Sequence, residues 1–296
     1  MVEEDGAGAR DERDVYEGRY VRARLRGAAG VAVLSVRREP ANAMNLHVWT
    51  ELGDALHAVE SCDRARALVI TSGLAKEAVF SAGNDITELH AKSTSRDRFD
   101  AFWTTLTRFL ARLYVSPLVT VACISGFCPA GGCVMALCCD LRVANRTAVI
   151  GLNESNLGII PPQFWAELMI KTVGPPAEQL LVQGELVDAQ RALQLGLVHR
   201  VVDSAGSRAE LLEHCCEAAE QYLKATRSDA GRALTKAHLR KPFSDAWAAN
   251  AQREAEQSWE LLNRPVVMEQ LTAVLEQLSG KRDGAKKSKQ AQVAKL

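Results

Sequence analysis

The sequence predicts an α/β fold whose carboxy-terminal part is helical. Up to about residue 160, apolar segments of strand length alternate with amphipathic segments of helix length, which is typical of strand–helix units packed on one sheet. Beyond that point, apolar residues recur at the 3.6-residue spacing of helices. The 296 residues are 47% apolar, which is enough for a large buried core.

The first part of the chain predicts strands and helices in alternation. Two segments with alternating apolar residues, separated by Gly27 and Gly30, indicate a hairpin. A long amphipathic helix ends at Ser116–Pro117, because proline cannot continue it. The predicted strands are 19–25, 31–36, 67–72, 118–124, 141–144 and 149–152. The predicted helices are 46–61, 96–114 and 132–140, the last preceded by a loop from Gly126 to Gly132.

The second part of the chain predicts helices. Each segment has apolar residues on one face, as Val266, Leu271 and Leu278 show in the last one. The predicted helices are 176–183, 188–195, 208–226, 229–239, 245–262 and 265–278.

The two ends of the chain differ from the body between them. Residues 1–16 are acidic and lack the apolar stretch of a signal peptide, so we expect a mobile leader. Residues 280–296 form a basic tail, whose charges alone are typical of a solvated end. The tail ends in Ala294-Lys295-Leu296, a close variant of the peroxisomal address SKL. This tripeptide predicts binding to a peroxisomal import receptor and a location in the peroxisome or glycosome, with the mitochondrion as the alternative.

Charge and cysteine usage argue against several classes of protein. The 36 Lys and Arg residues balance the 36 Asp and Glu residues, so net charge favours neither nucleic acid nor a membrane surface. No apolar run approaches the roughly 20 residues that a membrane-spanning helix needs, and we expect a soluble protein. The eight cysteines match no zinc-binding spacing and predict buried, reduced thiols in a reducing compartment.

Three segments carry residues that could perform chemistry. In VTVACISGFCPAGGCVMALCCD (119–140), a buried strand runs through Gly131 and Gly132 into a helix. The first N–H groups of a helix can stabilise a negative oxygen, although such turns are mostly packing devices. VFSAGNDITELH (79–90) makes a similar turn, in which Asp85 could simply cap a helix.

The third segment is AVIGLNESNLGIIPPQFW (148–165), in which Glu154 lies among apolar residues. A lone Glu is by default solvated surface. If the fold buries it here, the carboxyl has a raised pKa that suits a general base.

Together these segments resemble the enoyl-CoA hydratase/isomerase (crotonase) superfamily. The resemblance covers roughly residues 17–275. Within the superfamily the sequence is most similar to the mitochondrial-type Δ3,Δ2-enoyl-CoA isomerases, which share CPAGGC, GLNE and LGII. The other matching phrases, in the family's order, are FSAGND, GFCPAGG, CDLRVA, ESNLGII and GELVDAQRALQLGLVHRVV. The resemblance implies a crotonase-like spiral of strand-strand-helix units, with a catalytic core over 17–205. It also implies a helical oligomerisation region over 206–279 that builds a homotrimer or hexamer.

The resemblance also assigns roles to residues. The backbone N–H groups of Asn84 and Gly131 would form an oxyanion hole, so that the side chain at 84 could vary, and Glu154 would be the acid–base residue. The segment 82–86 would line one side of the coenzyme A channel, and the segment 41–45 would line the other side. The implied substrate-binding residues are Ala82, Gly83, Asn84, Asp85, Ile86, Gly131 and Asn153. No metal or redox cofactor is implied, because coenzyme A is part of the substrate.

One departure from the family pattern selects a reaction. Hydratases of the family use two glutamates to hold a water, and the first of these positions is Val134 here. A single base suffices to move a proton from C2 to C4, so the resemblance implies a Δ3,Δ2-enoyl-CoA isomerase of β-oxidation. Dienoyl-CoA isomerases place a further acid near Ile160–Pro162, where this sequence has none. The alternatives are another acyl-CoA reaction on the same fold, such as hydration or thioester hydrolysis, and a non-catalytic relative that binds RNA or a protein.

Overall fold

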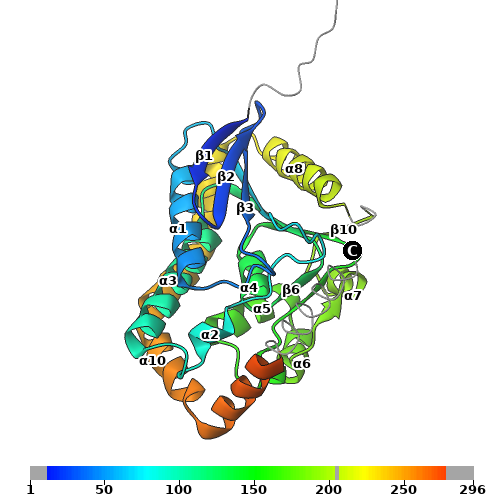
Figure 1. The fold of residues 1–296 in the computed structure, drawn as a ribbon. Helices are drawn as coiled ribbons and strands as arrows, with labels where there is room; N and C mark the ends of the chain where they lie inside the picture. Colours follow the sequence, from blue (N-terminus) through cyan, green and yellow to red (C-terminus); the bar gives the residue numbers. More distant parts are fainter. Residues whose placement is uncertain (1–11, 204–206, 278–296) are drawn as a thin grey trace, which may run out of the picture.

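The computed structural model describes residues 12–203 and 207–277, which form two sheets surrounded by helices (Figure 1). The larger sheet has seven strands in the order β1-β2-β3-β4-β5-β7-β10, and the smaller has the order β6-β8-β9. The strands are β1 (Arg13–Glu17), β2 (Val21–Arg26), β3 (Val31–Val36), β4 (Ala67–Ser72), β5 (Val119–Ile124), β6 (Phe127–Pro129), β7 (Leu141–Asn145), β8 (Val149–Gly151), β9 (Val187–Asp188) and β10 (Arg200–Val202).

Most helices lie between or after these strands. They are α1 (Leu46–Glu60), α2 (Ile86–Leu89), α3 (Arg96–Val115), α4 (Gly131–Cys138), the short 3₁₀ helix η1 (Glu154–Leu157), α5 (Gln163–Val173), α6 (Pro176–Gln183), α7 (Ala189–Gln194), α8 (Arg208–Ala225), α9 (Asp229–Ala249) and α10 (Ala251–Leu262). A further helix covers 265–277. Within the described residues, none of these helices is both long and apolar enough to cross a membrane.

The central strands β4 and β5 of the large sheet are buried on both faces. Leu68 and Ile70 of β4 point into the core formed with α1 and α3, whereas Ala67 and Val69 point to the opposite face, which α8 covers. Figure 1 shows α8 on the other side of the sheet from α1 and α3. Strands β3, β4, β5, β7 and β10 run parallel, and continuous apolar runs are typical of parallel strands covered on both sides.

The structure confirms the predicted α/β class and most of the predicted elements. The hairpin is β2–β3, the strand at 67–72 is β4, and the helices at 46–61, 96–114 and 132–140 are α1, α3 and α4 with ends shifted by one or two residues. All eight cysteines are free thiols and seven of them are buried. The sequence analysis did not predict α5, η1, β1, β9 or β10, and the predicted loop from Gly126 to Gly132 contains the strand β6.

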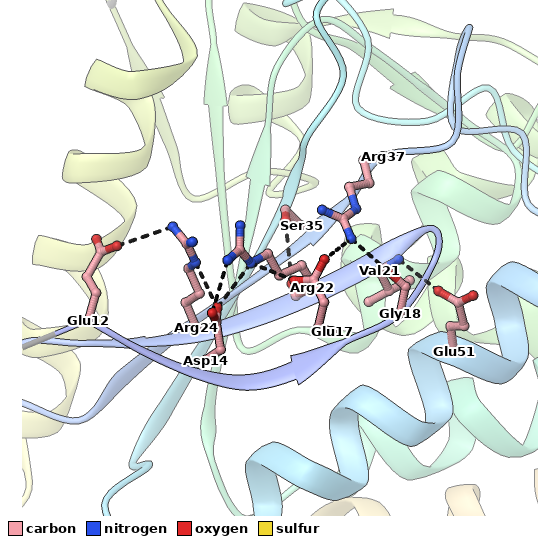
Figure 2. A network of polar contacts seen from close by, with 10 residues as sticks. All are labelled: Glu12, Asp14, Glu17, Gly18, Val21, Arg22, Arg24, Ser35, Arg37 and Glu51. Carbon is pink, nitrogen blue, oxygen red and sulfur yellow. Dashed lines mark hydrogen bonds and ion pairs between the residues drawn. The ribbon is translucent and has the colours of Figure 1, made fainter.

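The predicted boundary of the acidic leader is wrong, because residues 13–16 belong to β1. This strand pairs antiparallel with β2, and its half-exposed acidic side chains form ion pairs with the arginines of β2. Asp14 lies 3.0 Å from Arg22 and 2.9 Å from Arg24, and Glu17 lies 2.7 Å from Arg22 (Figure 2). Charges that look like a solvated end in the sequence are therefore cross-strand ion pairs.

The predicted break between the helices at 229–239 and 245–262 is also misplaced. α9 continues through Pro242 to Ala249, and α10 begins at Ala251. Tertiary contacts hold α9 along α3 on both sides of the proline, because Arg240 Nη1 donates to Tyr114 O at 3.0 Å and Ser244 Oγ donates to Ala111 O at 2.8 Å. These contacts outweigh the one backbone N–H that the proline removes.

The helices after residue 206 pack directly on the core. α8 covers the sheet, and Trp259 of α10 packs against Phe99 of α3 with ring centroids 5.2 Å apart. The division at residues 205 and 206 therefore does not separate two independent cores in the described part of the chain, and a role of this region in oligomerisation stays a prediction.

Candidate active site

Asn84 presents a free backbone N–H because of how its neighbours pair. Met44 forms a parallel bridge with Asn84, in which the Met44 N–H donates to Gly83 O at 2.8 Å and Met44 O accepts from Asp85 N–H at 2.9 Å. In a parallel ladder the residue between two bonded neighbours directs its own N–H away from the partner strand. The Asn84 N–H makes no hydrogen bond to another described residue and is available to a ligand.

Gly131 supplies a second free N–H beside the first. It is the first residue of α4, where a helix has no internal partner for its N–H groups. A methyl group built at Gly131 would lie 3.3 Å from Asn84 N and 3.0 Å from Asn84 Oδ1. Glycine allows this close approach without crowding, so the structure brings together the two amides that the resemblance pairs.

The backbone of Ala130, directly before Gly131, has an unusual conformation. Its φ is 47° and its ψ is −121°, a region that residues with a side chain rarely adopt. The Ala130 N–H donates to Gly151 O at 2.9 Å, and Ala130 O accepts from Val134 N–H at 3.0 Å. Such strain costs about 1–3 kcal/mol and persists where surrounding contacts hold it, often at functional sites.

Glu154 is a buried carboxylate to which no other described side chain donates a hydrogen bond. It opens η1 with only 3% of its surface exposed, and its Oε2 atom makes no hydrogen bond within the described residues. Burial raises the pKa of Glu154 to about 7, and its own backbone N–H opposes that rise. A carboxyl with this pKa can both accept and return a proton near neutral pH.

Two side-chain hydrogen bonds hold the turn that carries Glu154. Ser155 Oγ donates to Leu181 O and Asn156 Nδ2 donates to Gly184 O, each at 2.7 Å. Both acceptors lie at the end of α6, so this helix holds the turn that carries Glu154.

The glutamate turn lies next to the glycine turn. β6 and β8 pair so that Pro129 is opposite Gly151, three residues before Glu154. The pKa of the Cys133 thiol in α4 is raised first by burial and then by the negative charge of Glu154, which places the carboxylate near the first turn of that helix. Val134 follows in the same turn and is completely buried.

The other predicted site residues lie beside Asn84 or beside Glu154 in the sequence. Ala82 N–H donates to Ala41 O at 2.8 Å, which joins the segments 41–45 and 82–86. Asp85 caps α2 by accepting from Thr87 N–H at 3.1 Å and pairs with Arg38 at 2.6 Å, so the capping role considered for it is present. Gly83 has a φ of 83°, Ile86 opens α2, and Asn153 precedes η1 with a buried Oδ1 that no described residue contacts by hydrogen bond.

The sequence analysis missed one residue that contacts this site. Trp49 of α1 is completely buried, and its Nε1 donates to Asn84 Oδ1 at 3.1 Å. In the sequence Trp49 is one member of an apolar helical stripe, and the stripe gives no sign that the indole N–H has a polar partner.

Two surface grooves lie away from these turns. One of about 490 Å³ is lined by residues that include Arg22, Arg26 and Arg208, and one of about 700 Å³ is lined by residues of α8 and α9. Glu154 lines neither groove. Arg22 and Arg26 are already paired with carboxylates, so we assign the reacting groups to the turns around Glu154 instead.

Comparisons with known proteins agree with this geometry. The family model described as enoyl-CoA hydratase/isomerase matches residues 26–281. The chain is 34% identical over 253 residues to the human protein named enoyl-CoA delta isomerase 1, mitochondrial, covering 84% of this chain and 80% of that protein. It is 33% identical over 223 residues to the crotonyl-CoA hydratase of Syntrophomonas wolfei, covering 74% and 78%.

A solved structure confirms the predicted crotonase-like fold. The structure of human mitochondrial delta3-delta2-enoyl-CoA isomerase superposes with a TM-score of 0.81 at 32% identity, covering 89% of this chain and 99% of that one.

The comparisons contradict the predicted peroxisomal or glycosomal location. The human relative and the human structure are both named mitochondrial. The tripeptide Ala294-Lys295-Leu296, on which that prediction depended, lies outside the described residues. A short terminal pattern carries less information than similarity over more than four fifths of the chain.

The match to the family model spans most of the chain, and the fold agrees with that of a solved member. The chain therefore belongs to the enoyl-CoA hydratase/isomerase family.

Proposed function

We propose that this protein is a Δ3,Δ2-enoyl-CoA isomerase, which converts a 3-enoyl-CoA into the trans-2-enoyl-CoA during β-oxidation of unsaturated fatty acids. One observation carries the proposal. The buried carboxylate of Glu154, with a pKa raised to about 7, lies in the turn next to two adjacent backbone N–H groups, those of Asn84 and Gly131, which are free to bind a ligand. Similarity to a human enoyl-CoA delta isomerase supports this choice within the family.

The proposed reaction moves one proton. Glu154 removes a proton from C2, the electron pair of that C–H bond forms a C1–C2 double bond, and the carbonyl electron pair moves onto the thioester oxygen. The C3–C4 double bond stays in place until C4 is protonated, when the carbonyl re-forms and the double bond moves to C2–C3. The N–H groups of Asn84 and Gly131 donate to this oxygen, and loss of one such donor typically costs about 10²–10³ in rate. The protonated Glu154 then gives the proton to C4, so that substrate and product are isomers and the carboxylate is regenerated.

The environment of Glu154 favours isomerisation over hydration. A hydratase needs a second group to hold the attacking water, and Val134 at the position of the family's other glutamate offers no polar atom. Similarity to a crotonyl-CoA hydratase keeps hydration as the second candidate. Thioester hydrolysis would also need a held water, and a purely non-catalytic role leaves a buried, unpaired carboxylate unexplained.

The remaining proposals concern the substrate and the protein's surroundings. We propose that the segments 41–45 and 82–86 line the channel for coenzyme A, which is part of the substrate, and that no metal or redox cofactor takes part. The names of the human relatives favour the mitochondrion as the compartment. We also propose that the protein forms a homotrimer or a hexamer.

Two substrates separate the candidate functions. Purified protein is incubated with 3-hexenoyl-CoA and, separately, with 2-hexenoyl-CoA, and 2-enoyl and 3-hydroxyacyl products are followed by chromatography. The proposal predicts rapid formation of 2-hexenoyl-CoA from the first substrate and little 3-hydroxyhexanoyl-CoA from the second. Hydration as fast as isomerisation would identify a hydratase instead.

A further inference from the structure

The side chain of Asn84 lies between a buried indole and the oxyanion turn. Its Oδ1 accepts from Trp49 Nε1 at 3.1 Å and lies 3.0 Å from the position of a Cβ at Gly131. The other atom of the amide, Nδ2, makes no hydrogen bond to a described residue. The orientation of this amide is therefore set by the indole donor, because only the carbonyl end can accept its proton.

Trp49 is itself rigidly placed. It is completely buried on α1, and its ring packs against Phe109 of α3 with centroids 5.6 Å apart and planes at 47°. The helix begins directly after the Met44 bridge, where Asn45 caps α1 by accepting from Val48 N–H at 3.1 Å. One short stretch of chain thus pairs with the backbone around Asn84 and also supplies the donor for its side chain.

A free Asn84 carbonyl would compete with the substrate. Asparagine side chains readily accept hydrogen bonds from nearby backbone N–H groups. Oδ1 lies next to Gly131, whose N–H has no partner among the described residues. If Oδ1 turned onto this N–H, it would occupy a donor that the thioester oxygen needs.

We propose that Trp49 is a positioning residue for the oxyanion hole. Its indole N–H holds the side-chain carbonyl of Asn84, so that the backbone N–H groups of Asn84 and Gly131 stay free for the thioester oxygen. The inference deepens the proposed isomerase function, since it assigns a role to a residue that does not touch the substrate. It also means that the side chain at position 84 is not free to vary independently of position 49.

Three variants test the pair: Trp49→Phe, Asn84→Leu and the double variant. Trp49→Phe keeps an aromatic ring but releases the Asn84 carbonyl, and we expect kcat to fall at least about 10-fold with KM changed less than about 3-fold, as expected for a partly blocked donor. Asn84→Leu removes the competing carbonyl but leaves the buried indole N–H of Trp49 without its acceptor, so we expect its kcat to lie below that of the parent and above that of Trp49→Phe. The double variant should regain the activity lost in Trp49→Phe, because an apolar pair replaces both polar partners.

Trp247→Phe is the matched control. Trp247 of α9 is also completely buried, but its indole lies beside the buried carboxylate of Glu254 and not beside the oxyanion turn. We expect this variant to fold, by circular dichroism, and to keep the parent kcat. The proposal is overturned if Trp49→Phe keeps the parent kcat, if it loses no more than Trp247→Phe, or if the double variant is as impaired as Trp49→Phe.

A binding measurement separates this inference from the isomerase assignment. Acetoacetyl-CoA in its enolate form carries a negative oxygen that needs the same two donors, and its affinity is measured by calorimetry. We expect Trp49→Phe to bind it at least about 10-fold more weakly and the double variant to bind it like the parent. If the parent fails to isomerise 3-hexenoyl-CoA while this binding pattern holds, the proposed function falls and the role of Trp49 stands; unchanged binding in Trp49→Phe overturns the role.

Discussion

At the scale of single residues, burial and not a neighbouring charge raises the pKa of Glu154. The carboxylate is 3% exposed, and burial is the main cause of its raised pKa. A Lys or Arg beside it would lower that pKa and remove its ability to hold a proton near neutral pH. The apolar surroundings of Glu154 are therefore what gives its carboxyl the pKa that the proposed reaction needs.

We expect Glu154→Gln to abolish isomerase activity while the fold is kept. The amide has nearly the same shape but no basic lone pair for the C2 proton, and loss of a general base costs about 10²-fold or more. The rate with 3-hexenoyl-CoA and the circular dichroism spectrum are measured together. A variant with more than about a tenth of the parent rate would show that Glu154 is not the sole base.

Val134→Glu tests whether the missing second carboxylate limits hydration. Val134 is completely buried in the first turn of α4, near the Cys133 thiol on which the Glu154 charge acts. A second carboxyl could hold a water for attack, so we expect measurable hydration of 2-hexenoyl-CoA that the parent lacks. A folded variant that hydrates no faster than the parent would mean that pocket shape, not this residue, excludes hydration.

A second buried glutamate should make stability depend on pH. Burial also raises the pKa of Glu254 to about 7, opposed by the backbone N–H of Phe164 and the indoles of Trp247 and Trp103. The folded state therefore keeps a proton that the unfolded chain releases above its ordinary pKa near 4.5, so stability falls as pH rises from about 4.5 to about 7.

Urea unfolding at about pH 5 and about pH 7.5 measures this effect. The parent should have the higher midpoint at the lower pH, and Glu254→Gln should reduce the difference. Part of the difference should remain, because Glu154 has a pKa raised in the same direction. Equal parent midpoints at the two pH values would contradict the prediction.

At the scale of secondary-structure elements, the start of α4 is the most constrained point of the site. Gly131 has little room for a side chain, since a Cβ there would lie 3.0 Å from Asn84 Oδ1 and 3.2 Å from Met44 Cε, and both atoms would have to move aside. Gly131→Ala should therefore push the two amides apart and lower kcat by more than about 10-fold, since part or all of one donor is lost. Gly53→Ala is the control, because a Cβ at that position of α1 meets no atom within 4 Å and should leave the rate unchanged.

The elements differ in how far the sequence could predict them. β4 and α3 were predictable because their apolar patterns decide their burial. β1 was not, because its pairing with β2, and the ion pairs of its acidic residues with the β2 arginines, follow only from the strand register. The continuity of α9 through Pro242 likewise depends on contacts with α3, more than a hundred residues earlier.

The candidate site shows the same division. The positions of Asn84, Gly131 and Glu154 followed from the resemblance of three short segments to a known family. The Trp49–Asn84 hydrogen bond and the positive φ of Ala130 did not, because both depend on how distant segments meet. The Met44–Asn84 bridge brings Asn84 next to the start of α1, and this contact is a property of the fold. The apolar stripe of α1 in the sequence does not reveal that Trp49 has Asn84 as its partner.

At the scale of the whole molecule, several large aliphatic side chains stay exposed on the helices and loops outside the sheet core. Val182 of α6 is 73% exposed, and Leu234 and Leu239 of α9 are 72% and 73% exposed. Ile160, in the loop after the glutamate turn, is 65% exposed. Contact between copies of the chain would remove such side chains from water, at about 25 cal/mol for each Å² of apolar surface.

We therefore expect a homotrimer in solution, alone or paired into a hexamer. Sedimentation velocity at micromolar concentration measures the mass directly, and we expect three or six times the 32.2 kDa of one chain. Association follows mass action, so a tight oligomer should keep its mass on about tenfold dilution. The thermal stability of such an oligomer should also vary little with protein concentration. A species of one-chain mass at micromolar concentration, with unchanged isomerase activity, would show that the exposed aliphatic residues are not an assembly surface and that each chain builds its site alone.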